Sequence, residues 1–412
     1  MHEAADHWHE PEDWTQKAGA GAFARPTLPY DKFMNEQEIP IVRDYGVRKV
    51  QNLPRKPWAR MGGKGTFIQL YGTEGLWGCY VVEVPGSGAL NVEKHIYEEQ
   101  FLCVEGRGST EIWQEEGGKK SVFEWQTGSM FSIPVNTYHR IVNAASSPAL
   151  LLAGTSAPNL MNFLDNEDFV FNNDFVFRDR FDGRADYFRV LDSVARDPVR
   201  GLAMRKSNII PDVINCDLPL DNRRSPGARR LQLQMTGNRF HVWVAEHRTG
   251  RYSKAHAHGS AAVLICLKGA GYTYCWPRDI GTRPFEEGKR DKVVRVDYEP
   301  VGMVSAAPGG GEWFHQHFGI ANGPLRISAW FGPNNARGHG AGVPGTSIKD
   351  AGAIDIRDGG SAIPYDEEDP YLRKEYEETL ASVGARTEME DWLYTKPKPG
   401  EVRPMANFMS GM

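Results

Sequence analysis

The stretch Ala255-His256-Ala257-His258-Gly259-Ser260-Ala261-Ala262 leads into the apolar run Val263-Leu264-Ile265-Cys266-Leu267, which ends at the turn Lys268-Gly269-Ala270-Gly271. Successive side chains of a β-strand point to opposite faces, so His256 and His258 point the same way. Neutral imidazoles are suitable ligands for iron, copper, nickel and zinc. A histidine pair alone also arises by chance on protein surfaces, but the rest of the chain favours half of a transition-metal site.

Glycine and proline divide the chain into many short runs. Its 412 residues include 44 glycines and 26 prolines, which separate β-branched and aromatic runs such as residues 65–71 and 78–84. Short runs interrupted in this way are typical of all-β sandwiches and barrels. We therefore predict an all-β chain that is long enough for two or three domains.

Composition and charge exclude several classes of partner and location. The chain has 48 Lys and Arg against 53 Asp and Glu, a net charge of −5, and no basic stripe, so we expect no nucleic-acid binding. No apolar run approaches the roughly 20 residues that span a bilayer, so we expect no membrane insertion. The first ten residues lack the basic and apolar regions of a signal peptide, and the five cysteines are scattered without a CxxC pair. These features predict a cytoplasmic protein with reduced thiols.

Two segments of the chain repeat each other at one constant offset, without a gap. The matching pairs are Val81 and Val244, Glu83 and Glu246, His95 and His258, Gly106 and Gly269, and Gly108 and Gly271. A duplication of this kind predicts two similar domains. We divide the chain into an irregular N-terminal arm (1–60), a first β unit (61–160), a linker (161–234), a second β unit (235–345) and a C-terminal helix with a tail (346–412).

Smaller elements are expected in two of these segments. We expect a short helix near residues 188–195 of the linker and a helix over residues 366–380, where Tyr371, Tyr376 and Leu380 have a helical spacing. The tail beyond Gly384 is expected to be extended. The arm's histidines, His2, His7 and His9, are expected to form no site.

The first unit carries Glu93-Lys94-His95-Ile96-Tyr97-Glu98-Glu99 before a glycine turn and, further on, Gly128, Pro134, His139 and Asn143. This arrangement resembles the two motifs of the cupin superfamily, HxHxxxE and G…PxxxxHxxxN. The resemblance covers both β units and implies two cupin barrels (double-stranded β-helices, or jelly rolls) in one chain. It maps Glu93, His95, Glu99 and His139 to the four ligand positions. These residues form either a second metal site or a degenerate copy with a salt-bridged interior.

In the second unit the same mapping retains His256 and His258 but places Ala262 at the carboxylate position. The third ligand must come from the run Trp313-Phe314-His315-Gln316-His317. Matching Gly128 and Pro134 to Gly302 and Pro308 leaves a short insertion before His315 and a longer one before His317. The smaller insertion favours His315 as the ligand and His317 as a neighbour that faces substrate.

In this detail the second unit resembles the gentisate and salicylate 1,2-dioxygenase group of bicupins, although there the active barrel is the N-terminal one. The resemblance implies Fe(II), with Mn, Ni and Zn as alternatives, held by His256, His258 and His315. It makes His317, Trp313 and Tyr272 the candidate catalytic residues. Weaker candidates are Arg326, for binding a carboxylate, and His241 and His247, near the metal.

The function expected from this resemblance is a non-haem Fe(II) dioxygenase that uses O₂ to cleave a C–C bond of a ring, enol or diol in a small oxygenated substrate, for which an aromatic compound is the first expectation. The alternatives are a divalent-metal decarboxylase, isomerase or hydrolase that does not use O₂, and a non-catalytic bicupin that binds a small molecule. By analogy with other cupins we also expect a homo-oligomer.

Overall fold

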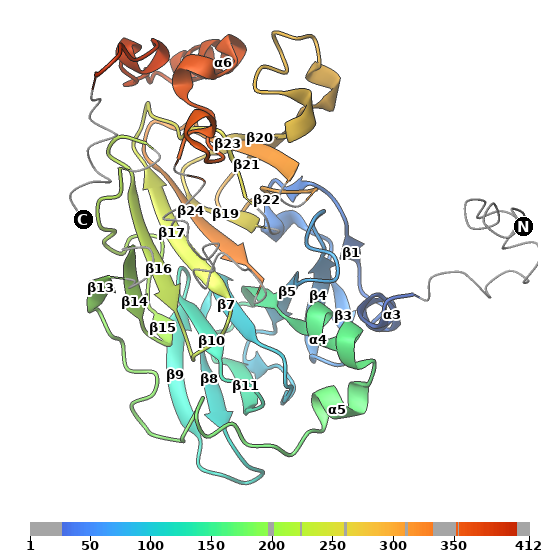
Figure 1. The fold of residues 1–412 in the computed structure, drawn as a ribbon. Helices are drawn as coiled ribbons and strands as arrows, with labels where there is room; N and C mark the ends of the chain where they lie inside the picture. Colours follow the sequence, from blue (N-terminus) through green and yellow to red (C-terminus); the bar gives the residue numbers. More distant parts are fainter. Residues whose placement is uncertain are drawn as a thin grey trace, which may run out of the picture.

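A computed structural model describes residues 27–196, 202–222, 225–258, 262–309, 312–332, 352 and 354–401. Most of these residues lie in two β-barrels, one above the other in Figure 1, with the helix α6 (Pro370–Ser382) beyond the second barrel. His2, His7 and His9 and the expected boundary at residue 345 lie outside the described residues. Of the described helices, none combines the length and apolar character needed to cross a bilayer.

The first barrel consists of two sheets. Its strands are β1 (Ile41–Val42), β3 (Lys56–Trp58), β4 (Gly63–Ile68), β5 (Gly78–Val84), β6 (Gly88–Ala89), β7 (Glu99–Glu105), β8 (Arg107–Trp113), β9 (Ser121–Gln126), β10 (Met130–Ile133), β11 (Tyr138–Asn143), β12 (Ala149–Thr155) and β15 (Ile209–Ile210). The larger sheet has the order β1-β4-β5-β12-β7-β10-β15, with β3 beside β4, and the smaller has the order β6-β11-β8-β9. From β5 to β8, and again from β9 to β12, consecutive strands alternate between the two sheets, as in a jelly roll.

The second barrel has the same arrangement. Its strands are β2 (Gly46–Val47), β13 (Val194–Arg196), β14 (Ala203–Lys206), β16 (Arg229–Gln234), β17 (His241–His247), β18 (His256–Ala257), β19 (Ala262–Lys268), β20 (Gly271–Pro277), β21 (Val294–Tyr298), β22 (Met303–Ser305), β23 (Trp313–Gly319) and β24 (Leu325–Phe331). The sheet orders are β13-β14-β16-β17-β24-β19-β22-β2 and β18-β23-β20-β21.

The strand positions reproduce the repeat seen in the sequence. β17 and β19 begin at the same offset from β5 and β7 that relates His258 to His95. The offset from β12 to β24 is larger, so the second barrel has gained residues in between. The prediction of an all-β chain with two jelly-roll barrels and a C-terminal helix is confirmed, whereas the described part of the arm is not irregular, since it contains a helix and three strands paired with the barrels.

The larger sheets of the two barrels share one apolar core instead of each closing over its own. One face of each sheet contributes to it, through residues such as Val81, Leu102 and Leu152 of the first barrel and Val244, Ile265 and Trp330 of the second. Their sequence neighbours, such as Val82 and Leu264, point instead into the interior of their own barrel. The continuous apolar runs of these strands are therefore explained by burial on both faces.

The predicted arm and linker tie the barrels together. In the arm, β1 pairs with β4 of the first barrel and β2 with β22 of the second. In the linker, β15 pairs with β10 of the first barrel, while β14 and β16 extend the larger sheet of the second. The remaining helices here are α3 (Pro29–Glu36), α4 (Ala157–Leu164) and α5 (Glu167–Phe171).

The helix expected near residues 188–195 is absent: residues 185–188 form a turn and β13 follows. Tyr187 and Phe188 pack on one another against the first barrel core, with ring centroids 5.0 Å apart. That prediction was wrong because these aromatic residues are buried through a turn instead of along one helical face.

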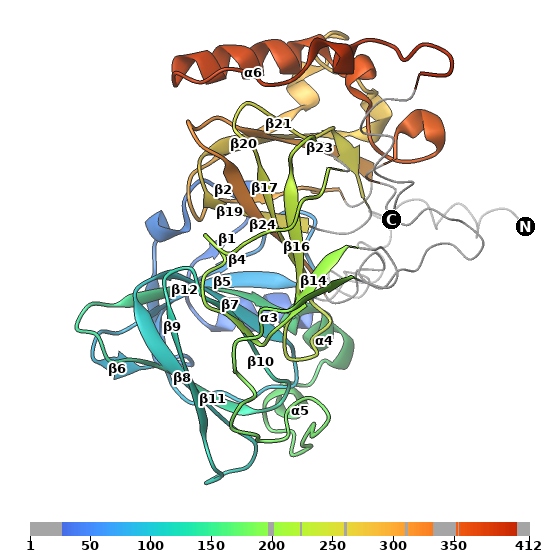
Figure 2. The ribbon, with the colours of Figure 1, turned by 90° about the vertical axis from the view of Figure 1, so that its left-hand side faces the viewer.

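The C-terminal helix α6 lies against the smaller sheet of the second barrel (Figure 2). Asp369 caps it by accepting a hydrogen bond from the backbone nitrogen of Tyr371, and Pro370 begins it. Its buried residues are Leu372, Tyr376 and Leu380, whereas Tyr371 stacks on Phe285 outside that face. The tail beyond Gly384 is not wholly extended, since residues Asp391–Tyr394 form a 3₁₀ turn that also packs on α6.

We predict that Gly154→Ala weakens the contact between the barrels. A Cβ atom at Gly154 in β12 would lie 2.7 Å from the ring of Trp330, which is fully buried in β24. Overpacking of this kind costs about 1–3 kcal/mol of unfolding free energy, to be measured by urea denaturation. Gly323→Ala is the matched control, because its Cβ would meet nothing within 4 Å. Equal stabilities of the two variants would contradict the shared core.

Candidate metal centre

Three buried histidines from neighbouring strands of the second barrel converge on one point. β18 carries His256 and leads into His258, and its antiparallel pairing with β23 places His256 opposite His315. One ring nitrogen of each of these three lies within 4.8 Å of the others. None is more than 6% exposed. The structure therefore brings together the three residues that the sequence predicts as ligands.

The strand positions also identify the counterpart of His139. In the first barrel, Glu93 bridges to His139, just as His256 pairs with His315 in the second. The offset from His139 to His315 equals the offset from the first residue of β12 to the first residue of β24. His317 lies two residues further along the chain than this offset predicts, and it does not pair with His256. His315 is thus the positional equivalent of His139.

The donor set of the second barrel fits a divalent transition metal. His256 Nδ1 lies 3.0 Å from the carbonyl oxygen of Lys254, which places the proton on Nδ1 and turns Nε2 toward the other rings. His256 Nε2 and His315 Nε2 are 3.1 Å apart. Two ligand atoms at right angles around a metal, with bonds of about 2.1 Å, are separated by roughly 3.0 Å. With Ala262 buried at the carboxylate position, the set is three neutral nitrogens.

His317 lies beside this cluster. Its Nδ1 is 2.8 Å from the hydroxyl oxygen of Thr273, and its ring centroid is 5.2 Å from that of His315. His315 and His317 lie on the same face of β23, and both line one cavity with His256 and His258. His317 is thus placed in the wall of the cavity and held there by Thr273.

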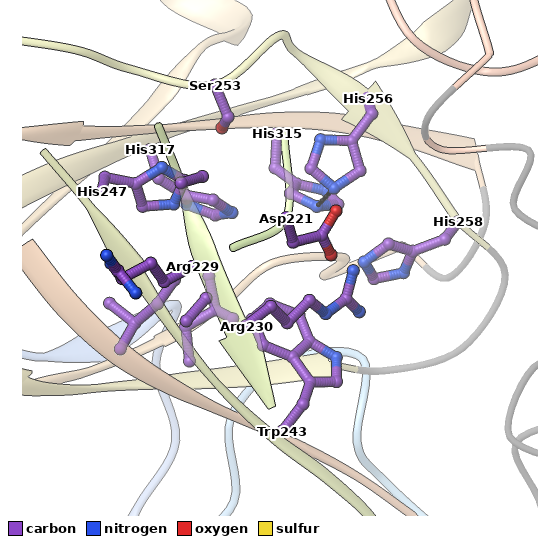
Figure 3. A pocket seen from close by; sticks show the side chains of 14 residues that line it. Asp221, Arg229, Arg230, Trp243, His247, Ser253, His256, His258, His315 and His317 are labelled. Carbon is purple, nitrogen blue, oxygen red and sulfur yellow. Dashed lines mark hydrogen bonds between the residues drawn. The ribbon is translucent and has the colours of Figure 1, made fainter. Parts of the chain in front are cut away.

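The cavity also contains polar residues that sequence reasoning missed. Its volume is about 40 Å³, and Asp221, Arg229, Arg230 and Trp243 contribute to its lining (Figure 3). Figure 3 shows the Asp221 carboxylate turned toward the histidine cluster, and the Arg230 guanidinium lies 4.1 Å from the Trp243 ring. Asp221 and Arg230 come from the segment predicted to be a linker, where no motif marks them. The alternation of Leu231 and Leu233 with polar residues indicates a strand that carries Arg230, but not the cavity that this strand faces.

Two predicted catalytic residues are not brought to this cavity. Tyr272 lies on the opposite face of β20, because it pairs with Phe318 while its neighbour Thr273 pairs with His317. It is fully buried under α6 and stacks on Phe318. Trp313 lies at the start of β23 and contacts Tyr45 of the N-terminal arm, with ring centroids 6.4 Å apart, outside the cavity lining. Tyr272 thus lies outside the site because it is on the other face of its strand. Trp313 lies outside it in contact with the N-terminal arm.

Of the three weaker candidates, His247 lies at the cavity, whereas Arg326 and His241 do not line it. Arg326 forms an ion pair with Glu246 at 2.9 Å and donates to the backbone oxygen of Cys216, so its guanidinium is used within the fold. His247 lines the cavity, whereas His241 packs on Phe331 with ring centroids 5.3 Å apart.

The first barrel holds a second cluster, formed by His95, Glu99 and His139. Glu99 accepts a hydrogen bond from the Tyr80 hydroxyl at 2.6 Å, and its other oxygen lies 3.3 Å from His95 Nε2. Burial alone would raise the pKa of Glu99, but the adjacent His95 and His139 imidazoles and the Tyr80 hydrogen bond hold it below the usual value. Burial, with the neighbouring His95, lowers the pKa of His139 to about 4. The carboxylate is thus already satisfied by protein groups.

Glu93, the fourth residue of the first-barrel mapping, takes part in an ion pair instead of facing the cluster as a ligand. Its carboxylate contacts the guanidinium of Arg60, which also lies 3.8 Å from the centroid of the Phe171 ring. Burial raises the pKa of Glu93, and Arg60 opposes this shift. The interior of this barrel is therefore salt-bridged at the position where the second barrel has His256.

A buried carboxyl group of the C-terminal segment lies behind the ligand strands. Glu368 accepts hydrogen bonds from the Tyr252 hydroxyl at 2.6 Å and from Gln316 Nε2 at 2.5 Å. Burial raises its pKa to about 7, against the lowering effect of these two hydrogen bonds. Gln316 separates His315 and His317 in β23, so this carboxyl group is linked to the ligand strand from its outer face.

No protein-family model matches the chain, and no curated protein matches its sequence. Similar solved structures include a point variant of oxalate decarboxylase from Bacillus subtilis, with 11% identity over 69% of this chain and 76% of that chain and a TM-score of 0.43. Another is vicilin from hazelnut (Corylus avellana), with 10% identity over 71% of this chain and 86% of that chain and a TM-score of 0.43.

We predict that Arg60→Met destabilises the protein by about 2 kcal/mol. Removing one partner of a buried ion pair typically costs about 3–5 kcal/mol, and the 25% exposure of Arg60 reduces that figure. Methionine preserves the packing on Phe171. The double variant Arg60→Met/Glu93→Gln should recover at least half of the loss, because no unpaired charge remains. Urea unfolding measures both, and a double variant as unstable as Arg60→Met would contradict the ion-pair explanation.

A second prediction concerns pH. The pKa of Glu368 is about 7 in the folded protein against an ordinary 4.5, so the folded state binds this proton more tightly. Its contribution to stability is complete below about pH 4.5 and is lost as pH rises through 7, a total of about 3 kcal/mol. Glu368→Gln should remove this loss from unfolding free energies measured between pH 5 and 8. Glu378→Gln, at a side chain that is 67% exposed, is the control; parallel profiles for Glu368→Gln and wild type would refute the assignment.

Proposed function

We propose that the second barrel binds Fe(II) through His256, His258 and His315 and that the protein is a non-haem dioxygenase acting on a small oxygenated substrate. The observation that carries this proposal is the cluster of three buried histidine nitrogens without a carboxylate among them. Fe(II) held by three neutral ligands would supply redox chemistry toward O₂ and retain open positions for a chelating substrate.

The cavity walls suit a compact, oxygen-rich substrate. A cavity of about 40 Å³ holds a few water molecules, whereas an apolar cavity that takes up benzene is about 150 Å³. Within the walls that the structure describes, we therefore place an enol or diol of a few carbons ahead of the aromatic compound expected from the sequence. The apolar side chains of Trp243, Leu264 and Ile327 exclude water from one side.

Polar groups around the cavity have separate roles in this proposal. Arg230, positioned on the Trp243 ring, would bind a negatively charged oxygen of the substrate. His317, held by Thr273, and Asp221 are the groups able to accept a proton from a substrate hydroxyl. Loss of that proton converts a hydroxyl into a stronger metal-binding oxygen.

The test is metal analysis and O₂ uptake of protein purified anaerobically, stripped with a chelator and reloaded with Fe(II). We expect one iron in the second barrel and O₂ consumption with at least one member of a panel of enols, diols and hydroxylated aromatic acids. His315→Ala should weaken iron binding by more than roughly 100-fold, since even outer residues around metal ligands contribute 10–100-fold. His317→Ala should keep the iron and lower kcat/KM by roughly 10²–10⁴-fold.

His139→Ala provides the matched control, since it removes the equivalent histidine of the first barrel and should leave iron in the second barrel and O₂ uptake intact. Turnover of any of these substrates without O₂ would instead indicate a Lewis-acid enzyme. Bound iron without any turnover would indicate a binding protein. Failure of His256, His258 and His315 to hold metal would reject the proposed site itself.

A further inference from the structure

The strand that carries His256 is short and is paired along both edges. β18 has only two residues, and on one side it pairs with β23. On its other side, the backbone nitrogen of Ala257 donates to Ser361 at 3.0 Å, and that of Ile363 donates to the carbonyl oxygen of Ala255 at 2.7 Å. His256 bridges antiparallel to Ala362 between these two bonds. Residues 361–363, which follow the barrel in sequence, thus complete the sheet beside the ligands.

Ser361 contacts the one residue that separates the two ligands of this strand. Its hydroxyl donates to the carbonyl oxygen of Ala257 at 2.6 Å, and its own carbonyl oxygen accepts from the nitrogen of Ala257. Both peptide groups that flank Ala257 are therefore fixed by a side chain and backbone that are at most 9% exposed. Fixing these peptides sets the directions in which His256 and His258 leave the backbone.

The same segment reaches the other ligand strand a few residues later. Glu368 binds Gln316 Nε2, and this amide also donates to the carbonyl oxygen of Ser253 at 3.0 Å. Gln316 is fully buried and lies between His315 and His317, on the face opposite them. Hydrogen bonds through Gln316 thus connect Glu368 with β23 and with Ser253, three residues before β18 begins.

We infer that residues 361–368 are a positioning element of the metal centre, which sets the separation of the strands carrying His256, His258 and His315 by binding both from outside the barrel. This inference rests on the proposed metal site but not on the proposed reaction. Ser361 and Glu368 touch neither the cluster nor the cavity and act through Ala257 and Gln316. The C-terminal extension is therefore part of the metal centre, and without it β18 would have one unpaired edge.

Cobalt(II) titration of the full-length protein tests this, in a His139→Ala background so that the first barrel does not contribute. We expect Ser361→Ala to weaken Co(II) binding by roughly 10–100-fold and to shift the visible absorption of the bound ion, because the ligand geometry relaxes. Ser361→Thr keeps the hydroxyl and should restore both. Glu368→Leu, which removes the acceptor of the Gln316 amide, should have the same effect as Ser361→Ala. Ser382→Ala, at an exposed hydroxyl of α6, is the control.

Unchanged Co(II) affinity and absorption in both Ser361→Ala and Glu368→Leu would overturn the inference, even if the melting temperature fell, because a merely structural role changes only the melting temperature. If the parent protein does not bind Co(II), or if His315→Ala leaves its Co(II) affinity unchanged, the metal site and this inference are overturned together. Co(II) binding that responds to Ser361→Ala in a protein whose Fe(II) form consumes no O₂ would leave the inference standing and reject only the dioxygenase.

Discussion

The antiparallel pairing of β18 with β23 is the constraint on which the metal centre depends. Because side chains alternate along a strand, a slip of one residue would turn His315 and His317 outward and Phe314, Gln316 and Phe318 inward. The outer face prevents this slip: Phe314 and Phe318 are buried in the core beneath α6. Burial of aromatic residues on the outside of the barrel therefore specifies which histidines point to its inside.

The two larger sheets pack on one another in a shared core, whereas the two smaller sheets, as the structure describes them, take no part in it and are covered by different segments. Val81 and Val244 occupy equivalent positions and meet in that core, so the repeat is preserved where the barrels touch each other. On the smaller sheets the partners are different: the second is covered by α6, whereas the first has none of the described helices of the C-terminal segment against it. The barrels thus share a scaffold and differ in what supports their ligand strands.

The sequence was sufficient for the features that follow from periodicity and repetition. Strand alternation placed His256 and His258 on one face, and the fixed offset predicted two similar β units. The jelly-roll barrels and the grouping of His95, Glu99 and His139 were implied by the resemblance to the cupin motifs. The remaining features depend on contacts between distant segments. Arg60 reaches Glu93 from the arm, Asp221 and Arg230 reach the cavity from the linker, and Ser361 reaches β18 from beyond the barrel. No local pattern marks such residues. Tyr272 was misplaced for a different reason: a motif match gives its position in the strand but not its face.

The divergence of the two sites has one electrostatic explanation. A buried carboxylate must be paired, and the first barrel pairs both of its own, Glu99 with Tyr80 and His95, and Glu93 with Arg60. A metal entering there would have to replace contacts that are already made. The second barrel has neutral imidazoles and places Ala262 where the first has Glu99, so that position carries no charge to satisfy. Of its charged residues at the cavity wall, Asp221 precedes β16, and Arg230 lies on β16, opposite Ala245, where the counterpart strand β4 has Gly65 opposite Val82. Of the two barrels as the structure describes them, the second therefore combines converging histidine nitrogens with charged side chains in the wall of the same cavity.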